Sequence, residues 1–177
     1  MNTLTSSLEF SHFPVMLSEI IQIASPEKGG LFIDCTFGGG SYSNALLKFP
    51  KTKVIGIDRD EAVISRANEL QKKYQKRFKF YQIKFSELDK ILNKNADTII
   101  FDLGLSSIQL KNLNRGFSFK SKNKLDMAMG LNNISAQEAI NNLSEKHLKL
   151  IIKILGEETE ASNIAKNIIK ARSEKKI

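Results

Sequence analysis

The sequence predicts an α/β fold built on a parallel, doubly wound sheet. Short apolar segments alternate with helical segments over residues 15–103, the pattern of strands joined by crossover helices. The last apolar segment, 96–103, is apolar enough to be buried on both faces, as strands of parallel sheets are. A triple glycine follows the first expected strand. With 177 residues, of which 41% are hydrophobic and 26% charged, the chain has the size and composition of one folded domain.

The expected elements follow from periodicity and from helix end signals. The first helix has 3.6-residue spacing and stops at Ser25-Pro26. The third helix has acids in its first turn and lysines in its last, which matches the helix dipole. The expected helices cover 15–24, 44–49 and 60–74, and the expected strands cover 31–36, 53–57, 78–83 and 96–103.

The pattern changes after residue 103. Residues 104–134 are rich in Ser, Asn, Lys and Gly without a clear period, and loops of this length are usually functional or disordered. Three helices are expected beyond it. Ser135 and Glu138 form a capping box, Ser144 caps the next helix, and a final helix covers 157–172 after Gly156. No fifth strand follows, so the four-strand sheet looks incomplete.

Composition limits the classes of function. Lysine and arginine outnumber acids by 27 to 19, a net charge of +8, which favours a polyanionic partner. The alternative is that the charge only reflects a basic, lysine-rich proteome. Cys35 is the only cysteine and lies in an apolar segment, so we expect a buried small side chain and no disulfide. Neither His12 nor His147 has metal-ligand spacing, and no metal is expected. Without a signal peptide or a membrane-spanning run of ~18 apolar residues, we expect a cytoplasmic protein with no membrane partner.

The glycine-rich segment IDCTFGGGSYS lies between the first strand and its helix. A dinucleotide fold carries G-x-G-x-x-G there, but Ser43 stands where the third glycine would be. No Gly-Lys-Ser/Thr follows, which argues against a phosphate-binding P-loop. Two interpretations remain for Gly38-Gly39-Gly40: a turn where a ligand approaches the backbone closely, or only a tight turn.

Two acids end neighbouring strands of the expected sheet. Asp58 follows the second strand, where an acid accepts hydrogen bonds from the ribose of an adenosine cofactor, either a nicotinamide dinucleotide or S-adenosylmethionine. Its alternative role is a helix N-cap, for which Asp60 is better placed. Asp102 follows the fourth strand and would face the same crevice. There it accepts a hydrogen bond from a reacting amine or from a cofactor ammonium, or else it caps the following turn.

The long loop contains an arginine and two spaced aromatic residues, Arg115, Phe117 and Phe119. Aromatic rings with nearby cations suit base stacking combined with phosphate contacts. The alternative is a loop held to the core by its two phenylalanines. Three lysines follow the aromatic residues, namely Lys120, Lys122 and Lys124.

Taken together, these stretches resemble the bacterial small-subunit rRNA cytosine-N4 methyltransferase family (RsmH, also called MraW). The resemblance runs in order from about residue 12 to residue 172, and the most specific part is DLGLSSIQL followed by RGFSF and LDMAM. The matching stretches are HFPV (12–15), IDCTFGGGSYS (33–43), GIDRD (56–60), KFSEL (84–88), DLGLSSIQL (102–110), RGFSF (115–119), LDMAM (125–129) and GEE (156–158).

The resemblance implies an S-adenosylmethionine-dependent enzyme that methylates N4 of a cytidine in the decoding region of 16S rRNA in the small ribosomal subunit. The implied fold is a Rossmann-like class I methyltransferase sheet, incomplete here, in 1–110, then a substrate-side loop in 111–134 and the start of a helical insertion domain in 135–177. Asp102 and Asp126 are the candidate proton acceptors, and Arg115, Phe117 and Phe119 the candidate substrate contacts. The expected cofactor-binding residues are Gly38, Gly40, Ser41, Tyr42, Asp58, Phe85, Asp102 and Gln109.

Three departures from the family pattern matter. Ser41 stands where the family usually has glycine, and Ala128 where it has arginine. The chain ends inside the helical insertion, without the later strands and an FHSLEDR-like motif, so we expect a fragment or a truncated product with an unpaired apolar sheet edge able to self-associate. Two other functions are kept as alternatives: a non-catalytic RNA- or ribosome-binding remnant, and a nicotinamide-dependent oxidoreductase.

Overall fold

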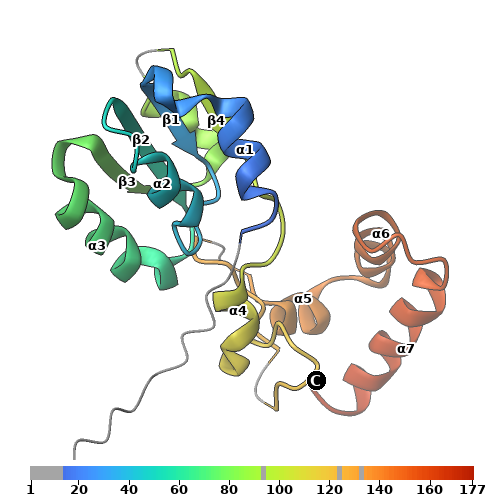
Figure 1. Ribbon diagram of the computed structural model, residues 1–177. Helices are drawn as coiled ribbons and strands as arrows, with labels where there is room; N and C mark the ends of the chain where they lie inside the picture. The colour runs from blue at the N-terminus through green and yellow to red at the C-terminus, as the bar shows by residue number, and fades with distance from the viewer. Residues whose placement is uncertain (1–13, 93–94, 123–124, 132–133) are drawn as a thin grey trace, which may run out of the picture. The chain divides into compact units, whose positions relative to one another are not determined.

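The computed structural model describes residues 14–92, 95–122, 125–131 and 134–177 (Figure 1). His12, Phe13 and Lys124, which belong to the sequence motifs above, lie outside the described residues. The chain forms two compact units, 1–108 and 109–177. The sheet lies in the first unit, and the described residues of the second unit form helices and loops; each unit is described by itself.

The sheet of the first unit has four parallel strands in the order β3-β2-β1-β4, which confirms the predicted α/β fold. Asp34, the last residue of β1, lies opposite Gly56 on one side and Ile100 on the other. The strands are β1 (Gly30–Asp34), β2 (Thr52–Asp58), β3 (Phe78–Gln82) and β4 (Thr98–Ile100).

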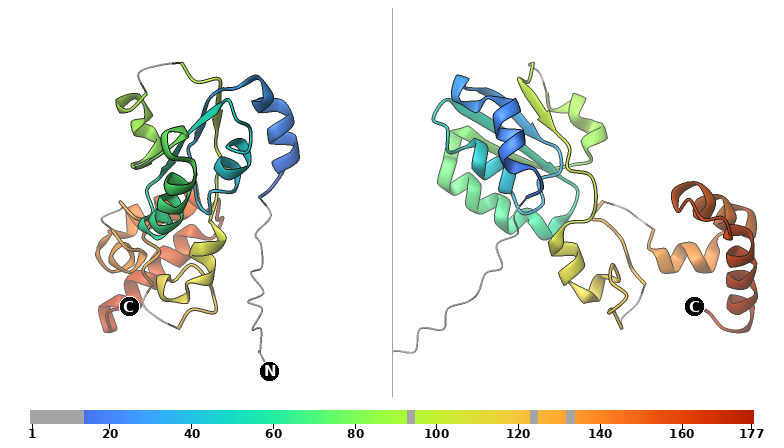
Figure 2. Two further views of the ribbon diagram at one scale, coloured as in Figure 1. Left: turned by 60° about the vertical axis from the view of Figure 1, so that its left-hand side comes forward. Right: turned by 45° about the vertical axis from the view of Figure 1, so that its right-hand side comes forward.

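Helices cover the two faces of the sheet unequally. Three α-helices pack on one face (Figure 2), where Phe32, Val54 and Phe78 are buried. One 3₁₀ segment, η4, covers Ile33 and Ile57 on the other face. The first unit contains α1 (Leu17–Ala24), α2 (Ser41–Leu46), α3 (Ile64–Tyr74), η1 (Pro26–Lys28), η2 (Glu61–Val63), η3 (Gln75–Arg77) and η4 (Phe85–Lys90).

This arrangement gives the sheet a switch point. The chain runs from β1 to β2 to β3 with its connections on the helical face, then returns past η4 to place β4 on the other side of β1. The loops after β1 and β4 therefore diverge at the carboxyl edge of the sheet. Ligands of open α/β sheets bind outside the strand ends at such a point.

Strand β4 departs from its prediction. It covers only Thr98–Ile100, and among the described residues β1 is its single strand neighbour. Ile99 is 43% exposed and Phe101 49% exposed. The expectation of burial on both faces is wrong, because β4 is an edge strand whose outward side chains lack cover in the described part of the unit. Among the described residues, the side of β4 away from β1 has no strand neighbour.

The predicted helix caps are confirmed. The Asp60 carboxylate accepts a hydrogen bond from the Ala62 amide at the start of η2. Ser135 and Glu138 form the capping box of α5. The Ser144 hydroxyl accepts from the His147 amide at the start of α6. Each cap satisfies an amide that would otherwise have no partner in the first turn.

The second unit is a set of short helices. Its buried seam is formed by Leu148, Ala161 and Ala165, where α6 and α7 meet. The last helix begins later than predicted, because Glu157 has a left-handed backbone (φ 52°) that interrupts the helix. The elements are α4 (Ser107–Lys111), which spans the boundary between the units, η5 (Leu113–Arg115), α5 (Ala136–Asn142), α6 (Glu145–Leu155) and α7 (Ala161–Glu174). None of the helices in the described ranges has both the length and the apolar character to cross a bilayer.

Candidate functional site

The glycine-rich turn after β1 leaves its central peptide open. Gly38 and Gly40 have left-handed backbones (φ 48° and 72°), which glycine adopts without steric cost. A Cβ on Gly40 would lie 2.6 Å from Cζ of Phe37, so only glycine fits there. Gly39, between them, is exposed and would have no heavy atom within 4 Å of an added Cβ. The turn therefore leaves a bare and exposed backbone segment at Gly39.

The two serines after the turn have ordinary structural roles. Ser41 starts α2 and has no left-handed backbone, so its presence in place of a glycine causes no strain. Ser43 is fully buried, and its hydroxyl donates to Asp34 Oδ2 at 2.7 Å. Ser43 stands at the position of the third glycine of G-x-G-x-x-G, and its side chain forms a buried hydrogen bond between α2 and β1.

Asp58 holds the glycine-rich turn in place. Its Oδ2 accepts from the Gly38 amide at 2.8 Å, and its Oδ1 accepts from the Asp60 amide at 2.9 Å. Burial raises the pKa of Asp58, and the amides of Asp60 and Gly38 counteract that shift. Because Asp60 is the N-cap of η2, Asp58 does not serve that role. A carboxylate oxygen accepts more than one hydrogen bond, so Asp58 retains acceptor capacity for a ligand.

Asp102 joins the ends of β4 and β1. Its amide donates to Thr36 Oγ1 at 2.7 Å, across the switch point. Its carboxylate lies beside the Tyr42 phenol: burial first, and then the charge and hydrogen bond of Asp102, raise the pKa of Tyr42 to about 12. The Tyr42 hydroxyl donates to the carbonyl of Val15. Asp102 itself is exposed and so accessible to a ligand.

Two aromatic rings stand at the same edge of the sheet. Phe85, at the start of η4, and Phe101, just after β4, are in edge-to-face contact with ring centroids 5.5 Å apart. Phe85 is 47% exposed, so part of its ring remains uncovered. A half-exposed aromatic ring offers an apolar surface on which a flat heterocycle can pack.

Sequence reasoning missed two charged residues near this turn. Asp34 is fully buried at the end of β1, and no group in the described part of the chain hydrogen-bonds to its Oδ1. Its signal in the sequence was an acid closing an otherwise apolar strand, LFID. Arg66, on α3, donates from Nε to the Gly39 carbonyl at 3.3 Å and pairs with Glu69. No local pattern marks Arg66, because its contact joins residues far apart in sequence.

The buried Asp34 carboxyl predicts a pH-dependent stability. Burial raises its pKa from 3.8 to about 6, although the Ser43 hydroxyl opposes the shift. The pKa of Asp34 is higher in the folded chain than in the unfolded chain. The protonated carboxyl therefore contributes fully to the free energy of unfolding below about pH 4, and this contribution is lost as the pH rises through 6. The loss is on the order of 3 kcal/mol. In urea denaturation, we expect Asp34→Asn to raise the urea concentration at the unfolding midpoint at pH 8. At pH 4 we expect the substitution to have little effect on that midpoint.

An exposed carboxylate provides the control for this experiment. Asp89→Asn, in η4, should give the same small change at both pH values. Equal destabilisation by Asp34→Asn at both pH values would contradict the prediction, because it would show that the lost hydrogen bond, and not the buried charge, dominates.

The RGFSF segment is partly tied down within the second unit. Arg115 Nη2 donates to the Ala128 carbonyl at 2.6 Å, and its guanidinium lies 5.3 Å from the centroid of the Phe117 ring. The Met127 amide donates to the Arg115 carbonyl at 2.8 Å. Phe119, by contrast, is fully exposed. The loop is thus held by Arg115, while one aromatic ring remains available for stacking.

The candidate site residues divide between the two units. Asp102 belongs to the first unit with the glycine-rich turn, Asp58 and Phe85. Asp126 belongs to the second, as do Arg115, Phe117, Phe119 and Gln109, which is 7% exposed on α4. No group of three or more potential metal-ligating side chains was found within the described ranges.

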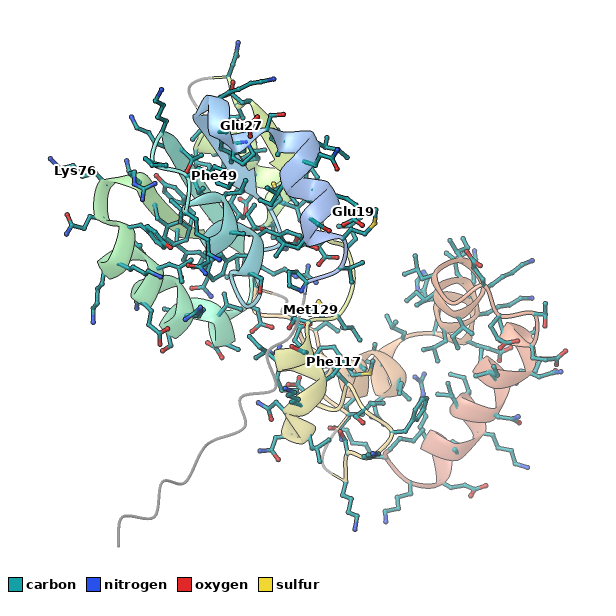
Figure 3. All side chains as sticks on the ribbon, viewed as in Figure 1. Glu19, Glu27, Phe49, Lys76, Phe117 and Met129 are labelled. Atoms are coloured by element: carbon teal, nitrogen blue, oxygen red, sulfur yellow. The ribbon has the colours of Figure 1, made fainter. Side chains whose placement is uncertain are left out.

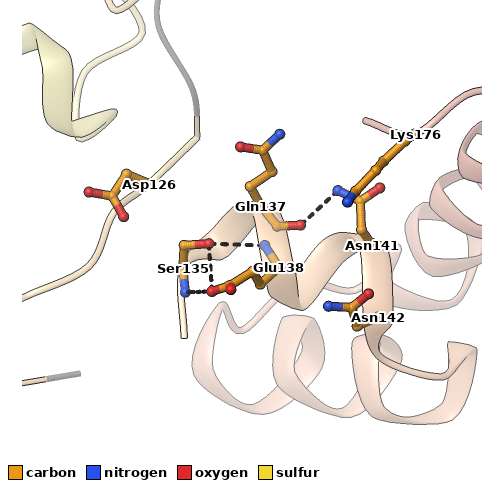
Figure 4. Close-up of a pocket in the computed structure, with 7 residues that line it drawn as sticks. All are labelled: Asp126, Ser135, Gln137, Glu138, Asn141, Asn142 and Lys176. Carbon is orange, nitrogen blue, oxygen red and sulfur yellow. Dashed lines mark hydrogen bonds between the residues drawn. The ribbon is translucent and has the colours of Figure 1, made fainter. Parts of the chain in front are cut away.

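Asp126 lines a polar hollow of about 470 Å³ in the second unit (Figure 4). Several residues that line this hollow hydrogen-bond to one another. Ser135 and Glu138 cap α5, and Asn141 Nδ2 donates to the Gln137 carbonyl at 2.7 Å. These bonds serve the helix and need no ligand. The lining residues are Asp126, Ser135, Gln137, Glu138, Asn141, Asn142 and Lys176.

Comparison with known proteins assigns the family. A family model described as the MraW methylase family matches residues 9–177, nearly the whole chain. The chain belongs to this family. The MraW resemblance seen in the sequence motifs is thereby confirmed.

Individual proteins similar to this chain support the same family assignment. A protein of Orientia tsutsugamushi named ribosomal RNA small subunit methyltransferase H is 44% identical over 94% of this chain. Proteins of the same name from Rickettsia massiliae and Rickettsia canadensis are 42% and 41% identical over 94% and 96% of the chain. The alignments cover 54–56% of these relatives, so the chain spans about half their length. A solved candidate rRNA-methylase of Clostridium thermocellum aligns over 54% of both chains at 16% identity, with a TM-score of 0.46.

Proposed function

We propose that the chain carries the cofactor-binding part of an S-adenosylmethionine-dependent methyltransferase that modifies N4 of a cytidine in the decoding region of 16S rRNA. The observation that carries the proposal is the meeting of the open glycine-rich turn, Asp58 and Asp102 at the switch point between β1 and β4. Membership of the MraW methylase family, with relatives named as small-subunit rRNA methyltransferases, supports the same activity.

The residues at this edge fit the cofactor. Gly39 leaves room beside the backbone for its methionine end, and the spare acceptor capacity of Asp58 suits the ribose hydroxyls. The exposed ring of Phe85 suits the adenine. When bound, S-adenosylmethionine supplies a methyl group on a positively charged sulfur. Within the first unit, the wider set proposed to surround it comprises Gly38, Gly40, Ser41, Tyr42, Asp58, Phe85 and Asp102, while Gln109, in the second unit, stays a prediction from the family resemblance.

The protein's part in the transfer is positioning and proton removal. The exocyclic amine of cytosine is a weak nucleophile, and it must lose a proton as its new N–C bond forms, so a nearby carboxylate helps. Of the two candidates, we assign this role to Asp102, since its exposed carboxylate lies in the same unit as the glycine-rich turn. The substrate contacts fall to Phe119, by stacking on a base, and to Arg115 and Phe117, which shape the loop.

Two binding and activity measurements test the proposal. Calorimetric titration should show binding of S-adenosylhomocysteine and no comparable binding of NAD. Incubation of the chain with small ribosomal subunits and labelled S-adenosylmethionine, followed by nucleoside mass spectrometry, should yield N4-methylcytidine. Tighter binding of NAD would instead favour a nicotinamide-dependent oxidoreductase, although the buried Ser43 in place of the third fingerprint glycine weighs against it.

One observation favours a second function, an RNA- or ribosome-binding protein without turnover. Ala128 stands where the family pattern has arginine, and here only its backbone carbonyl is used, as the acceptor for Arg115. The loss of a guanidinium removes a group suited to two-pronged contact with phosphate. Salt-sensitive binding of RNA with no transfer of labelled methyl groups would identify this function.

The unpaired side of β4 predicts self-association with a second copy of the chain. Among the described residues this side of β4 has no strand neighbour, and the exposed side chains of Ile99, in β4, and Phe101, just after it, are apolar. An open apolar edge pairs readily with another edge unless charges block it. We expect Ile99→Lys to shift the chain from dimer to monomer in multi-angle light scattering. Leu155→Lys, at an exposed position of the second unit, should leave the dimer unchanged. A wild-type chain that is monomeric at all concentrations would rule out this pairing.

A further inference from the structure

A group of cations lies at the amino ends of β1, β2 and β3, the edge of the sheet opposite the candidate site. The cations come from η1, from the residues that lead into and form β2, from the end of α3, and from η3 and β3. The six lysines are exposed and the arginine is half-buried. We call this surface the basic edge: Lys28, Lys51, Lys53, Lys73, Lys76, Arg77 and Lys79.

Direct contacts make the basic edge one continuous surface. Arg77 Nη1 donates to the Phe49 carbonyl at 3.0 Å, which ties η3 to the segment before β2. Figure 3 labels Phe49 and Lys76, the residue that precedes Arg77 in the chain. An added Cβ on Gly29 would lie 2.8 Å from Cβ of Lys51, so the lead-ins to β1 and β2 touch. The strand pairing brings β3 alongside β2. The cations therefore project from adjoining segments.

An aromatic ring orders part of this surface. Lys73 Nζ and the Arg77 guanidinium lie 5.0 Å and 5.3 Å from the centroid of the Tyr74 ring. The Tyr74 hydroxyl donates to Asn44 at 2.9 Å, which fixes the ring. Contacts of this kind hold cations in place without neutralising them.

The charge of the basic edge is largely uncompensated. The ion pairs found in the described parts of the chain are Arg66–Glu69 and Lys90–Glu87, and neither involves a residue of the basic edge. Two acids flank it, Glu27 and Asp97, and the carboxylate of Asp97 accepts a hydrogen bond from the Leu31 amide. A surface with this excess of cations attracts a partner that carries many negative charges.

We infer that the basic edge binds the phosphodiester backbone of RNA at a distance from the modified nucleotide. The inference rests on the proposed rRNA substrate and adds a second, remote contact to it. β2 has seven residues, so the basic edge lies roughly 20 Å from the carboxyl edge, a span that one RNA strand of several nucleotides covers. Such contacts fix the register of an RNA without reading its sequence.

RNA is favoured over an anionic membrane by the side chains that are absent from this surface. Membrane-binding surfaces combine cations with exposed large apolar residues. Within the described residues, none of the exposed large hydrophobic side chains falls in segments 26–31, 47–53 or 72–79, which build the basic edge. A purely polar, cationic surface suits phosphates that remain in water.

The test compares two triple variants that remove the same charge. Lys51→Ala/Lys76→Ala/Lys79→Ala removes part of the basic edge, and Lys146→Ala/Lys149→Ala/Lys153→Ala removes exposed lysines of α6. Fluorescence anisotropy with a labelled hairpin from the decoding region of 16S rRNA gives affinity at several KCl concentrations. We expect the first variant to bind about tenfold or more weakly, with its slope of log affinity against log salt reduced by about 2 to 3. The α6 variant should stay within about twofold of the wild type.

The other possible results show whether the inference, the proposed function or both must be abandoned. Equal weakening by the two variants would show an effect of net charge alone and overturn the inference. RNA binding that is unchanged in the first variant would overturn it while leaving the proposed function intact, and a wild-type chain that binds no RNA would overturn both. Loss of binding to phosphatidylglycerol vesicles with RNA binding intact would assign the basic edge to a membrane. Titration with S-adenosylhomocysteine, expected to be unchanged in the first variant, shows that its fold is preserved.

Discussion

Replacement of Asp102 by asparagine is expected to lower methyl transfer by about 10²–10⁴-fold, the range that a lost general base costs. The substitution keeps the size of the side chain and the amide that donates to Thr36, so the link between β4 and β1 survives. It removes the negative charge and the strong acceptor beside Tyr42. Transfer is measured with labelled S-adenosylmethionine and small ribosomal subunits.

Asp102 has two candidate roles, and they are distinguished by measuring both the rate of methyl transfer and the affinity for S-adenosylhomocysteine in Asp102→Asn. If its carboxylate takes the proton of the cytosine amine, the rate falls and the affinity for S-adenosylhomocysteine holds. If it binds the ammonium of the cofactor, the affinity falls as well. Asp126→Asn is the matched control, because Asp126 is the other candidate and lies in the second unit. Full activity in Asp102→Asn together with inactive Asp126→Asn would reverse the assignment.

The sequence predicted the elements that depend on local patterns. Alternating apolar segments located all four strands, and the caps at Asp60, Ser135 and Ser144 were placed correctly because each satisfies amides a few residues away. Strand β4 was predicted too long and too buried. Apolar composition is shared by edge and central strands, so it does not reveal which neighbours a strand has.

The geometry of the candidate site was predictable in part for the same reason. The sequence placed Asp58 and Asp102 at one edge of the sheet because both follow strands of a parallel sheet, whose carboxyl ends meet at that edge. The contact of Arg66 with the Gly39 carbonyl joins two elements separated by 27 residues, and no spacing rule predicts it. The sequence also left the role of Ser41 open, and the structure accounts for it by placing the left-handed backbones at Gly38 and Gly40.

Substitution of Gly40 by alanine is expected to destabilise the first unit by about 2–4 kcal/mol. An alanine with φ near 72° carries a left-handed strain of roughly 1–2 kcal/mol, and its Cβ would overlap Phe37 at 2.6 Å. Phe37 has little room to move, since it is 2% exposed and its ring centroid lies 5.7 Å from that of Phe78 and 5.2 Å from that of Phe80. Chemical denaturation measures the loss.

Gly39→Ala tests whether the exposed backbone of the turn is needed for ligand binding and not for folding stability. Gly39 has no left-handed backbone and no neighbour within 4 Å of an added Cβ, so this variant should keep its stability within about 0.5 kcal/mol. Its methyl group would occupy the space that we propose for the cofactor, and we expect S-adenosylhomocysteine to bind about tenfold more weakly, a cost of ~1.4 kcal/mol. If Gly39→Ala binds as well as the wild type, the turn is only a tight turn. Weak binding with intact stability shows that the bare peptide serves a ligand, because folding alone does not require a glycine at that position.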